Sequence, residues 1–291
     1  MEQANTTDRD YSSISPSAKS LLMMKGLTPI PYAREAAALM IAPEPYVPDY
    51  SNKHPLFWAR VAHFETRYQS ISILLRNDPV KQILELSSGF SFRGLDWVHQ
   101  QDVHYIDTDL PEVVRQKNTF VQQLEQEAAP RKGLLEILPL NALDEQQFQE
   151  VISHFESGPL AMVNEGLLMY LGIAEKEQLC RIIHRILKER GGYWVTADIY
   201  LKPAAGTPSL RIDDQLQQFL EQHHVEDNMF DSIDQARSFF QANGFIIDEE
   251  AQPDYSQASA LKYLLENITE EQQQKMKNGG RIHTTWKLKA A

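Results

Sequence analysis

The sequence predicts an α/β protein built around a mostly parallel sheet, and three observations support this prediction. From Val80 onward, short apolar segments alternate with amphipathic segments at helical spacing, which is typical of right-handed βαβ units. A leading segment without any strand pattern precedes this alternation. After a long connection, the last residues alternate again, which predicts a final antiparallel strand at the edge of the sheet.

The chain is long enough to form one large domain with a substantial core. It has 291 residues, of which 42% are hydrophobic and 23% charged, and these are ordinary values for a folded protein. We interpret it as a single domain with an N-terminal helical cap at 1–78, a core at 79–200, a helical insert or lid at 201–244 and C-terminal strands at 245–291.

Charge and cysteine content argue against several classes of protein. The formal net charge of −12, without a cluster of basic residues, argues against a nucleic-acid-binding surface. The single cysteine, Cys180, excludes an internal disulfide and a cysteine metal site, and its apolar surroundings predict a place in a helix core. We expect no metal. We also expect a cytoplasmic protein without membrane contact, since the sequence lacks both a signal peptide pattern and an apolar run of membrane-spanning length.

The N-terminal part is predicted to be helical. Residues 1 to about 12 are polar and are expected to be disordered. The helical pattern of 15–41 is interrupted at Pro29 and Pro31, because proline ends or kinks a helix. A further helix is predicted from about Pro55 to Arg76, where apolar residues recur at helical spacing.

Five strands and the helices between them are predicted in the core. The strands cover 80–86, 103–106, 134–138, 160–163 and 193–197. Pro111 is suited to the first position of a helix, and Asp144 can cap the next one. The helix from about Ala174 is expected to end at Gly191 and Gly192.

The last third of the sequence contains an insert and two further strands. A polar helix is predicted at about 210–224, followed by a helix that contains Ala236, Phe239 and Phe240. Strands are then predicted at 245–247 and at 281–288, where β-favouring residues alternate.

Two short motifs in the core point to a ligand that contains adenosine. The first strand runs into a turn of small residues, Ser87, Ser88 and Gly89, and about twenty residues later the second strand ends at Asp109. Small residues let the backbone approach a ligand, and an acid at this place accepts hydrogen bonds from ribose hydroxyls. An ordinary strand-to-helix turn and an acid at a helix start are the alternative interpretations. The order and spacing of the two motifs favour adenosine binding.

Polar residues also follow the third and fourth strands. Asn141 and Ala142 come after the third strand, and Asn164 and Glu165 end the fourth. Ligands of open α/β sheets bind at the carboxyl edge of the strands, where these residues are expected to lie. A turn residue before a helix cap and a capping acid are the alternative interpretations of Asn141 and Glu165.

These motifs resemble the leucine carboxyl methyltransferase family, which includes bacterial O-methyltransferases that act on polyketide and other small carboxylic acids. The resemblance spans nearly the whole chain, and its most distinctive match is Glu-Gly-Leu-Leu-Met-Tyr-Leu at Glu165 to Leu171. The other matching segments are Ser15-Pro16-Ser17-Ala18 through Pro31-Tyr32-Ala33-Arg34, Ala59-Arg60-Val61, the turn with Gly89 and Arg93, Asp109-Leu110-Pro111 and Thr285-Trp286-Lys287-Leu288. It implies the class I methyltransferase fold, a Rossmann-like sheet with an antiparallel last strand, an N-terminal helical cap and a helical insert.

The resemblance also implies S-adenosyl-L-methionine as the cofactor. The cofactor-binding residues that it implies are Arg60, Glu85, Ser87, Gly89, Asp109, Asn141, Ala142 and Glu165. Asp109 would bind the ribose hydroxyls, the turn would run beside the methionine and ribose portion, and Asn141 with Ala142 would lie at the adenine. Arg60 would reach from the cap to the cofactor carboxylate, and Glu165 would lie near the amino group or the sulfonium.

The turn departs from the pattern of the family at three positions. The usual Gly-Ala-Gly is Ser87, Ser88 and Gly89, and the Asp commonly found two residues beyond is Ser91. Serine is small enough to preserve the close approach of the backbone. We therefore expect cofactor binding with altered contacts.

We expect an O-methyltransferase that acts on a carboxylate of a small molecule. A carboxylic acid, whose ordinary pKa is about 4, is already ionised near neutral pH and needs no general base, whereas a phenol with a pKa near 10 would usually need one. No catalytic residue is identified, and Tyr170 is a candidate for substrate orientation whose alternative role is packing against the cap. A protein C-terminal carboxyl methyltransferase and a non-catalytic cofactor-binding protein remain alternatives.

Overall fold

The computed structural model describes residues 15–126, 129–202, 225–278 and 282–291. Its strands are β1 (Gln82–Leu86), β2 (His104–Asp109), β3 (Leu134–Pro139), β4 (Leu160–Asn164), β5 (Gly192–Tyr200), β6 (Phe245–Glu250) and β7 (His283–Ala290). Its helices are α1 (Ser15–Lys25), α2 (Ala33–Ile41), α3 (Pro55–Asn77), α4 (Arg93–Gln100), α5 (Pro111–Leu124), α6 (Glu145–Ile152), α7 (Ile173–Arg190), α9 (Ile233–Ala242), α10 (Leu261–Leu265) and α11 (Glu270–Asn278), with 3-10 turns η3 (Leu168–Tyr170) and η4 (Tyr255–Gln257).

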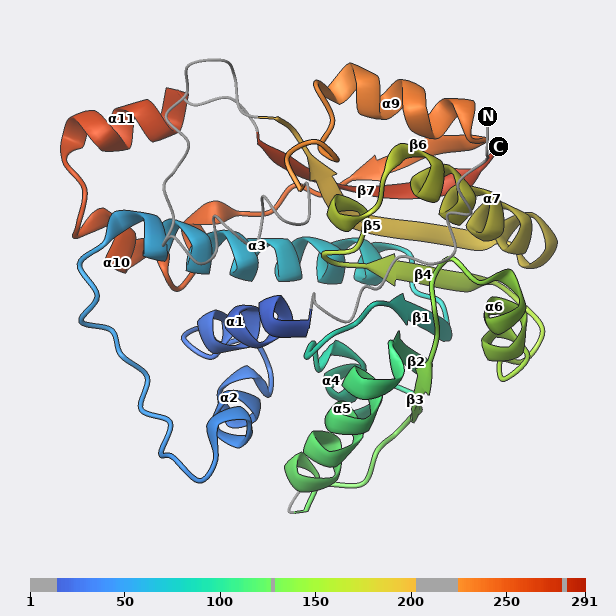
Figure 1. Cartoon of the computed structure of the whole chain (residues 1–291), viewed down its shortest axis with the longest axis horizontal. Helices are drawn as coiled ribbons and strands as arrows, with labels where there is room; N and C mark the ends of the chain where they lie inside the picture. The colour runs from blue at the N-terminus through green and yellow to red at the C-terminus, as the bar shows by residue number, and fades with distance from the viewer. Residues whose placement is uncertain (1–14, 127–128, 203–224, 279–281) are drawn as a thin grey trace, which may run out of the picture.

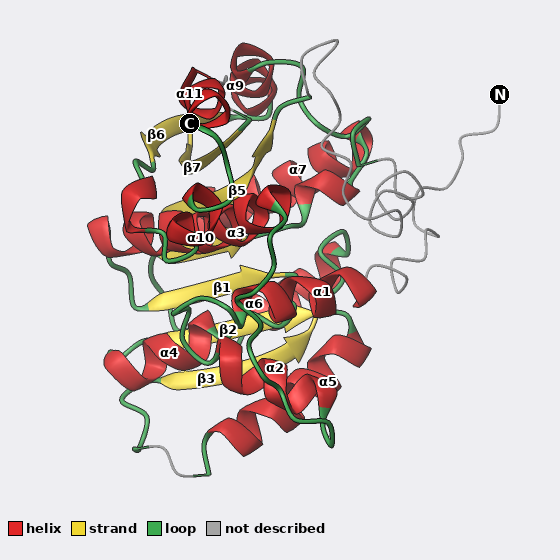
Figure 2. Cartoon of the chain, turned by 90° about the vertical axis from the view of Figure 1, so that its left-hand side faces the viewer, coloured by secondary structure: helices red, strands yellow, loops and turns green. Residues whose placement is uncertain are grey.

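The strands form one seven-stranded sheet in the order β3-β2-β1-β4-β5-β7-β6 (Figure 2). The pairs among β1 to β5 are parallel, and β7 is antiparallel to both β5 and β6. The predicted α/β class with a reversed last strand is confirmed. Its predicted place at the sheet edge is wrong, because β6 takes the edge and β7 lies inside it. The burial of the strands agrees: six successive residues of β7 are buried, whereas β6 is largely exposed or half-buried.

Helices cover both faces of the sheet (Figure 1). The alternation of side chains along each strand separates two apolar clusters. In β4, Met162 belongs to the cluster under α6, α7 and α9, whereas its neighbour Val163 faces α3, α4 and α5. The sheet is therefore the middle of three layers, which leaves the ends of the strands as the open place for polar residues.

The long helix α3 belongs to two parts of the molecule. Trp58 and Val61, near its start, pack with α10, whereas Ile71 and Leu75 lie in the core cluster on the sheet. The buried Glu65 carboxylate accepts hydrogen bonds from the N–H groups and hydroxyl at the start of α10. The second half of α3, which belongs to the predicted cap, is thus one of the layers on the sheet.

Local signals in the sequence placed many element boundaries correctly. The Asp144 side chain caps α6 by accepting hydrogen bonds from the backbone N–H groups of Gln146 and Gln147, and Gly191, with φ +76°, ends α7. Cys180 is fully buried in α7, as predicted, and burial raises the pKa of its thiol to about 12.

Other elements were missed or cannot be compared. The sequence patterns did not predict α4, α10 and α11. In addition, β5 extends to Tyr200, whereas the predicted strand ends at Ala197. The insert helix at 210–224 and the polar N-terminal stretch lie outside the described residues. Within the described ranges, no helix combines the length and the apolar composition needed to cross a membrane.

Candidate functional site

The candidate residues gather where four neighbouring parallel strands end. The turn 87–89 follows β1, Asp109 ends β2, Asn141 follows β3, and Glu165 follows β4. Because β3, β2, β1 and β4 are neighbours that run in the same direction, their carboxyl ends share one edge of the sheet. The structure therefore brings these predicted positions to the edge where ligands of open α/β sheets bind.

The turn after β1 and the acid after β2 contact each other directly. The Gly89 N–H donates to Oδ2 of Asp109 at 2.7 Å, and the Leu110 N–H donates to Oδ1 at 2.8 Å. Burial raises the pKa of Asp109, and the two N–H donors oppose that rise. A carboxylate has about four lone-pair sites, so Asp109 can still accept hydrogen bonds from a pair of ligand hydroxyls.

The backbone of this turn is left-handed at two positions. Ser87 has φ +49° and Gly89 has φ +50°. Among the described residues, a Cβ atom added at Gly89 would meet only Ala18 of α1 within 4 Å, at 3.7 Å. Helix α1 therefore lies close to the turn, and the backbone at Gly89 is open enough for a ligand to approach it.

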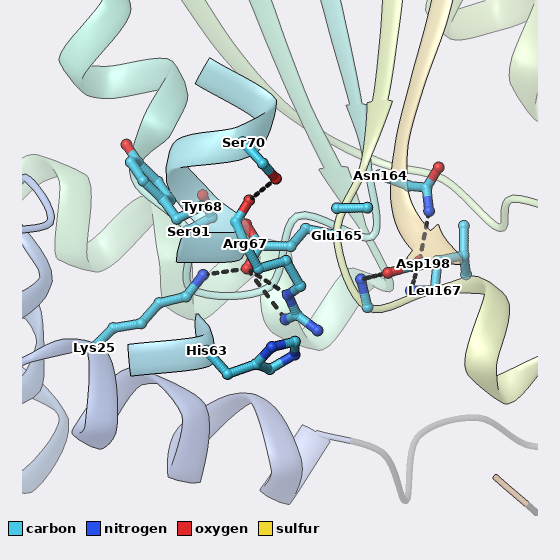
Figure 3. Close-up of polar contacts among 12 residues, drawn as sticks. Lys25, His63, Arg67, Tyr68, Ser70, Ser91, Asn164, Glu165, Leu167 and Asp198 are labelled. Atoms are coloured by element: carbon cyan, nitrogen blue, oxygen red, sulfur yellow. Dashed lines mark hydrogen bonds and ion pairs between the residues drawn. The ribbon is translucent and has the colours of Figure 1, made fainter. Parts of the chain in front are cut away.

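Glu165 lies at the centre of a buried charge cluster. Its Oε1 atom is 2.6 Å from Nζ of Lys25 and 3.1 Å from Nη2 of Arg67, and its Oε2 atom is 2.9 Å from Nη2 of Arg93. The carboxylate is only 3% exposed. Burial alone would raise the pKa of Glu165, but the three cations hold it well below its usual range. Figure 3 shows Lys25 and Arg67 reaching Glu165 from α1 and α3.

Arg67 also connects Glu165 to a pocket of aromatic and imidazole side chains. Its Nη1 donates to the Tyr200 hydroxyl at 2.8 Å, and that hydroxyl is 2.8 Å from Nε2 of His63. His283 donates from Nε2 to the Ala197 carbonyl at 2.7 Å, since a carbonyl only accepts. Burial lowers the pKa of His63 well below 6.5 and that of His283 to about 4, and it raises the pKa of Tyr200 to about 12. All three groups are therefore neutral near pH 7.

Asp198 on β5 holds the loop that carries Glu165. Its carboxylate accepts hydrogen bonds from the side-chain amide of Asn164 at 2.6 Å and from the backbone N–H groups of Gly166 and Leu167, each at 2.6 Å (Figure 3). The Trp194 indole donates to the Asn164 side-chain oxygen at 2.7 Å. These bonds fix the direction in which Glu165 leaves β4.

Glu85 and Asn141 have structural partners of their own. Glu85 is fully buried inside β1, where it accepts a hydrogen bond from the Tyr105 hydroxyl and lies 3.6 Å from Nε of Arg93. The exposed Asn141 side chain accepts from the Leu143 N–H at 3.0 Å, which forms an Asx turn before α6. These contacts favour a scaffold role for Glu85 and the turn interpretation of Asn141, whereas Ala142 is buried beside it.

The other two predicted residues, Arg60 and Tyr170, belong to α3 and η3. Arg60 lies on α3 about two turns before Arg67, and Arg67 makes the hydrogen bonds to Glu165. Tyr170 is the last residue of η3 and is half-buried. Arg67 is thus an arginine of the N-terminal segment that reaches this site.

The sequence patterns did not point to Lys25, Arg67, Asp198 or Tyr200. Lys25 directly follows four apolar residues of α1, and an isolated charge beside an apolar run was the available signal there, because a buried charge is costly without a partner. Arg67 lies among polar residues of α3 such as Glu65 and Thr66, so its neighbours in the sequence gave no such signal.

The charges of this region fit a ligand that joins a nucleoside to an amino acid. Lys25, Arg67 and Arg93 supply three positive charges, and Glu165, Glu85 and Asp198, whose charge also acts on Arg67, supply three negative ones. Lys25 and Arg67 suit an incoming carboxylate, while Glu165 suits an ammonium or a sulfonium. Asp109 and the open backbone at Gly89 suit the hydroxyls of a ribose.

Comparison with solved structures returned distant matches. One is mitomycin 7-O-methyltransferase MmcR, with 9% identity, a TM-score of 0.47 and coverage of 81% of this chain and 56% of that chain. Another is magnesium protoporphyrin IX methyltransferase from Synechocystis PCC 6803, with 9% identity, a TM-score of 0.46 and coverage of 80% and 86%. The chain spans about half the length of the first structures that it matches, 53% and 56%. A search of curated proteins returned no match.

A protein-family model provides the assignment. The model of leucine carboxyl methyltransferase matches residues 13–184, which is more than half of the chain. The matched region contains Lys25, Arg67, the turn 87–89, Asp109 and Glu165. The chain therefore belongs to the leucine carboxyl methyltransferase family, whose cofactor is S-adenosylmethionine.

Proposed function

We propose that this protein transfers a methyl group from S-adenosylmethionine to a carboxylate oxygen of a small molecule. The bound cofactor supplies an activated methyl group on its sulfonium. In this proposal the turn 87–89 and Asp109 hold the ribose, and Glu165 faces the amino group of the methionine end. The hydrogen bond between Gly89 and Asp109 and the charge balance around Glu165 support these positions.

We assign the carboxylate of the cofactor to Lys25 and Arg67 instead of Arg60. Both cations already lie within hydrogen-bond distance of Glu165, so a zwitterionic amino acid end can bind Glu165 through its ammonium and the cations through its carboxylate. The Arg67 guanidinium is only 3% exposed, and low exposure strengthens such pairs because water screens them less. Asn141 and Ala142 stay the proposed neighbours of the adenine, and the Asx turn that the Asn141 side chain forms would shape the backbone there.

The observation that carries the choice of a carboxylate is the protonation chemistry beside Arg67. Among the described residues there, Nε2 of His63 is hydrogen-bonded to the Tyr200 hydroxyl, and Nε2 of His283 donates to the Ala197 carbonyl. Burial lowers the pKa of both imidazoles, which makes them weak bases for taking a proton from a hydroxyl. An ionised carboxylate needs no such base. Alignment, exclusion of water and electrostatics then supply the catalysis.

Burial of the charge cluster supports a small acceptor. Glu165 is 3% exposed and Lys25 is 6% exposed, and α1 lies close to the cofactor turn. A small acid can be enclosed completely in such a place, whereas a protein terminus must enter it as a flexible tail.

Transfer of a labelled methyl group tests this proposal. The protein is incubated with S-adenosylmethionine tritiated on the methyl group and with aliphatic and aromatic carboxylic acids, each paired with the alcohol or phenol of the same skeleton. We expect label in a product that releases methanol in mild base, as an ester does, and none in base-stable ethers. Label only in ethers contradicts the carboxylate. Label only on a peptide with a free C-terminal carboxylate favours a protein acceptor, and cofactor binding without any transfer favours a non-catalytic protein.

A further inference from the structure

Lys117 is a buried cation to which the proposed function gives no role. It lies on α5, and its side chain is only 1% exposed. A buried ammonium is costly unless charged and polar partners surround it. The groups that contact the Lys117 ammonium therefore indicate its role.

The ammonium of Lys117 lies below the turn that we propose to hold the cofactor. It is 2.7 Å from Oδ2 of Asp107 and donates to the Ser88 hydroxyl at 2.9 Å. The ring of Phe92 lies 5.8 Å from the ammonium. Ser88 is the middle residue of the turn, and Asp107 precedes Asp109 by two residues on β2. One side chain thus connects the turn to the strand that carries the proposed ribose acid.

The bond to Lys117 completes the restraint on Ser88. The Ser88 N–H donates to the Thr108 carbonyl at 2.8 Å, and its carbonyl accepts from the Ser91 N–H at 2.9 Å. Its hydroxyl, bound to Lys117, is the third fixed group. The residues on both sides, Ser87 and Gly89, have left-handed backbones, so the turn has an unusual shape that must be held before a ligand arrives.

The anchor of Lys117 is part of a four-charge group beneath the turn. Asp107 lies opposite Glu85 on the neighbouring strand β1, and Glu85 faces Arg93 of α4. Burial raises the pKa of Asp107 to about 6 and Glu85 adds to that rise, whereas Lys117 and Arg93 oppose it. Above pH 6 the carboxylate is ionised and attracts Lys117, and below pH 6 protonation weakens that attraction.

We propose that Lys117 is a positioning residue for S-adenosylmethionine, which acts through the Ser88 hydroxyl and uses Asp107 as its anchor. The inference rests on the proposed place of the cofactor at the turn 87–89. An alternative is that Lys117 only stabilises the fold through its ion pair with Asp107. The two roles separate at Ser88, because Ser88→Ala removes the bond to the turn and leaves the ion pair in place.

Calorimetric titration with S-adenosylhomocysteine tests the inference without an acceptor. We expect Ser88→Ala and Lys117→Met each to weaken binding about tenfold at pH 7.5. The double variant is expected to bind no more weakly than Lys117→Met, because both changes remove the same connection. Ser259→Ala, which removes a hydroxyl that donates to Glu65 beside the start of α10, serves as the matched control and is expected to keep wild-type affinity.

The pH dependence gives a readout that a purely structural role would not move. We expect wild-type affinity to fall as the pH drops from 7.5 to 5.5, and Ser88→Ala to lose part of that dependence. Ser88→Ala keeps the ion pair and should fold even where Lys117→Met does not. If this variant binds with the affinity and the pH dependence of the wild type, the inference about Lys117 is wrong, while the proposed cofactor site stands. Absence of binding by the wild type overturns the proposed cofactor site and this inference together.

Discussion

Asp109 and Glu165 are two carboxylates at the same edge of the sheet, and they differ in their hydrogen-bond and ion-pair partners. Asp109 accepts hydrogen bonds from two backbone N–H groups. Glu165 contacts three cations, which α1, α3 and α4 contribute. Burial raises the pKa of Asp109, whereas the cations hold the pKa of Glu165 well below its usual range.

This difference matches the two ends of the proposed ligand. Ribose hydroxyls are neutral and need an acceptor that keeps free lone pairs, which Asp109 provides. The amino acid end carries charges of both signs and needs charges of both signs around it, which Glu165, Lys25 and Arg67 provide. Each carboxylate is thus prepared for a different part of one molecule.

The largest expected effect separates the two carboxylates by stability. We expect Glu165→Gln to lower the free energy of unfolding by about 3 kcal/mol, because three buried cations lose their countercharge. Asp109→Asn should cost only about 1 kcal/mol, since backbone donors need no charge on their acceptor. Urea denaturation at pH 7.5 measures both values. Equal losses of unfolding free energy in the two variants would contradict the inferred difference between the surroundings of the two carboxylates.

Next in size is the contrast between two arginines of α3. Arg67→Lys should weaken binding of S-adenosylhomocysteine about tenfold, or about 1.4 kcal/mol, because lysine cannot reproduce the forked contacts of the guanidinium. Arg60→Lys, the same change about two turns earlier, should leave that affinity within about twofold. Calorimetric titration with S-adenosylhomocysteine measures the affinity of both variants. The opposite ranking would restore the assignment of Arg60 that the family resemblance implies.

The pH dependence of stability gives a smaller, signed effect. Glu165 has a lower pKa in the folded protein than in the unfolded chain, where it is about 4.3. The group therefore stabilises the fold above that value, and the contribution is lost as the pH falls. The difference in unfolding free energy between wild type and Glu165→Gln should be constant from pH 8 to 6 and should shrink by about 1 kcal/mol at pH 3.5. If the difference in unfolding free energy between the two proteins grows toward acid pH, the lowered pKa of Glu165 in the folded protein is contradicted.

The smallest expected effect concerns the backbone beside Asp109. Ser87 has φ +49°, which glycine adopts without the steric cost that other residues bear. We expect Ser87→Gly to raise the free energy of unfolding by about 0.5 kcal/mol, after the greater flexibility of glycine in the unfolded chain is subtracted. Ser87→Ala is the control, because it keeps the strain and should bring no gain. A gain in both variants would attribute the effect to loss of the hydroxyl.

The two carboxylates also differ in how far the sequence could predict their surroundings. Asp109 and Gly89 were predictable because a strand, a turn and a second strand bring them together over a short stretch of chain. The partners of Glu165 were not, since Lys25 and Arg67 are 140 and 98 residues away from it along the sequence. Only the folded arrangement of α1 and α3 makes them neighbours.

The fold likewise has features that local sequence signals predict and features that depend on contacts between distant parts of the chain. Alternating apolar segments, prolines and glycines placed the parallel strands and several helix ends, because these signals act within a few residues. The insertion of β7 between β5 and β6 depends on pairings between strands that are distant in sequence. Local patterns cannot show that arrangement, and for this reason the predicted edge position was wrong.

The central claim is that Asp109 and Arg67 bind different ends of one cofactor molecule, and one calorimetric comparison tests it. S-adenosylhomocysteine and 5′-methylthioadenosine, which lacks the amino acid end, are titrated into wild type, Asp109→Ala and Arg67→Lys. We predict that Asp109→Ala weakens binding of both ligands and that Arg67→Lys weakens only S-adenosylhomocysteine. Equal weakening of both ligands by Arg67→Lys, or unchanged affinity in Asp109→Ala, would contradict the account.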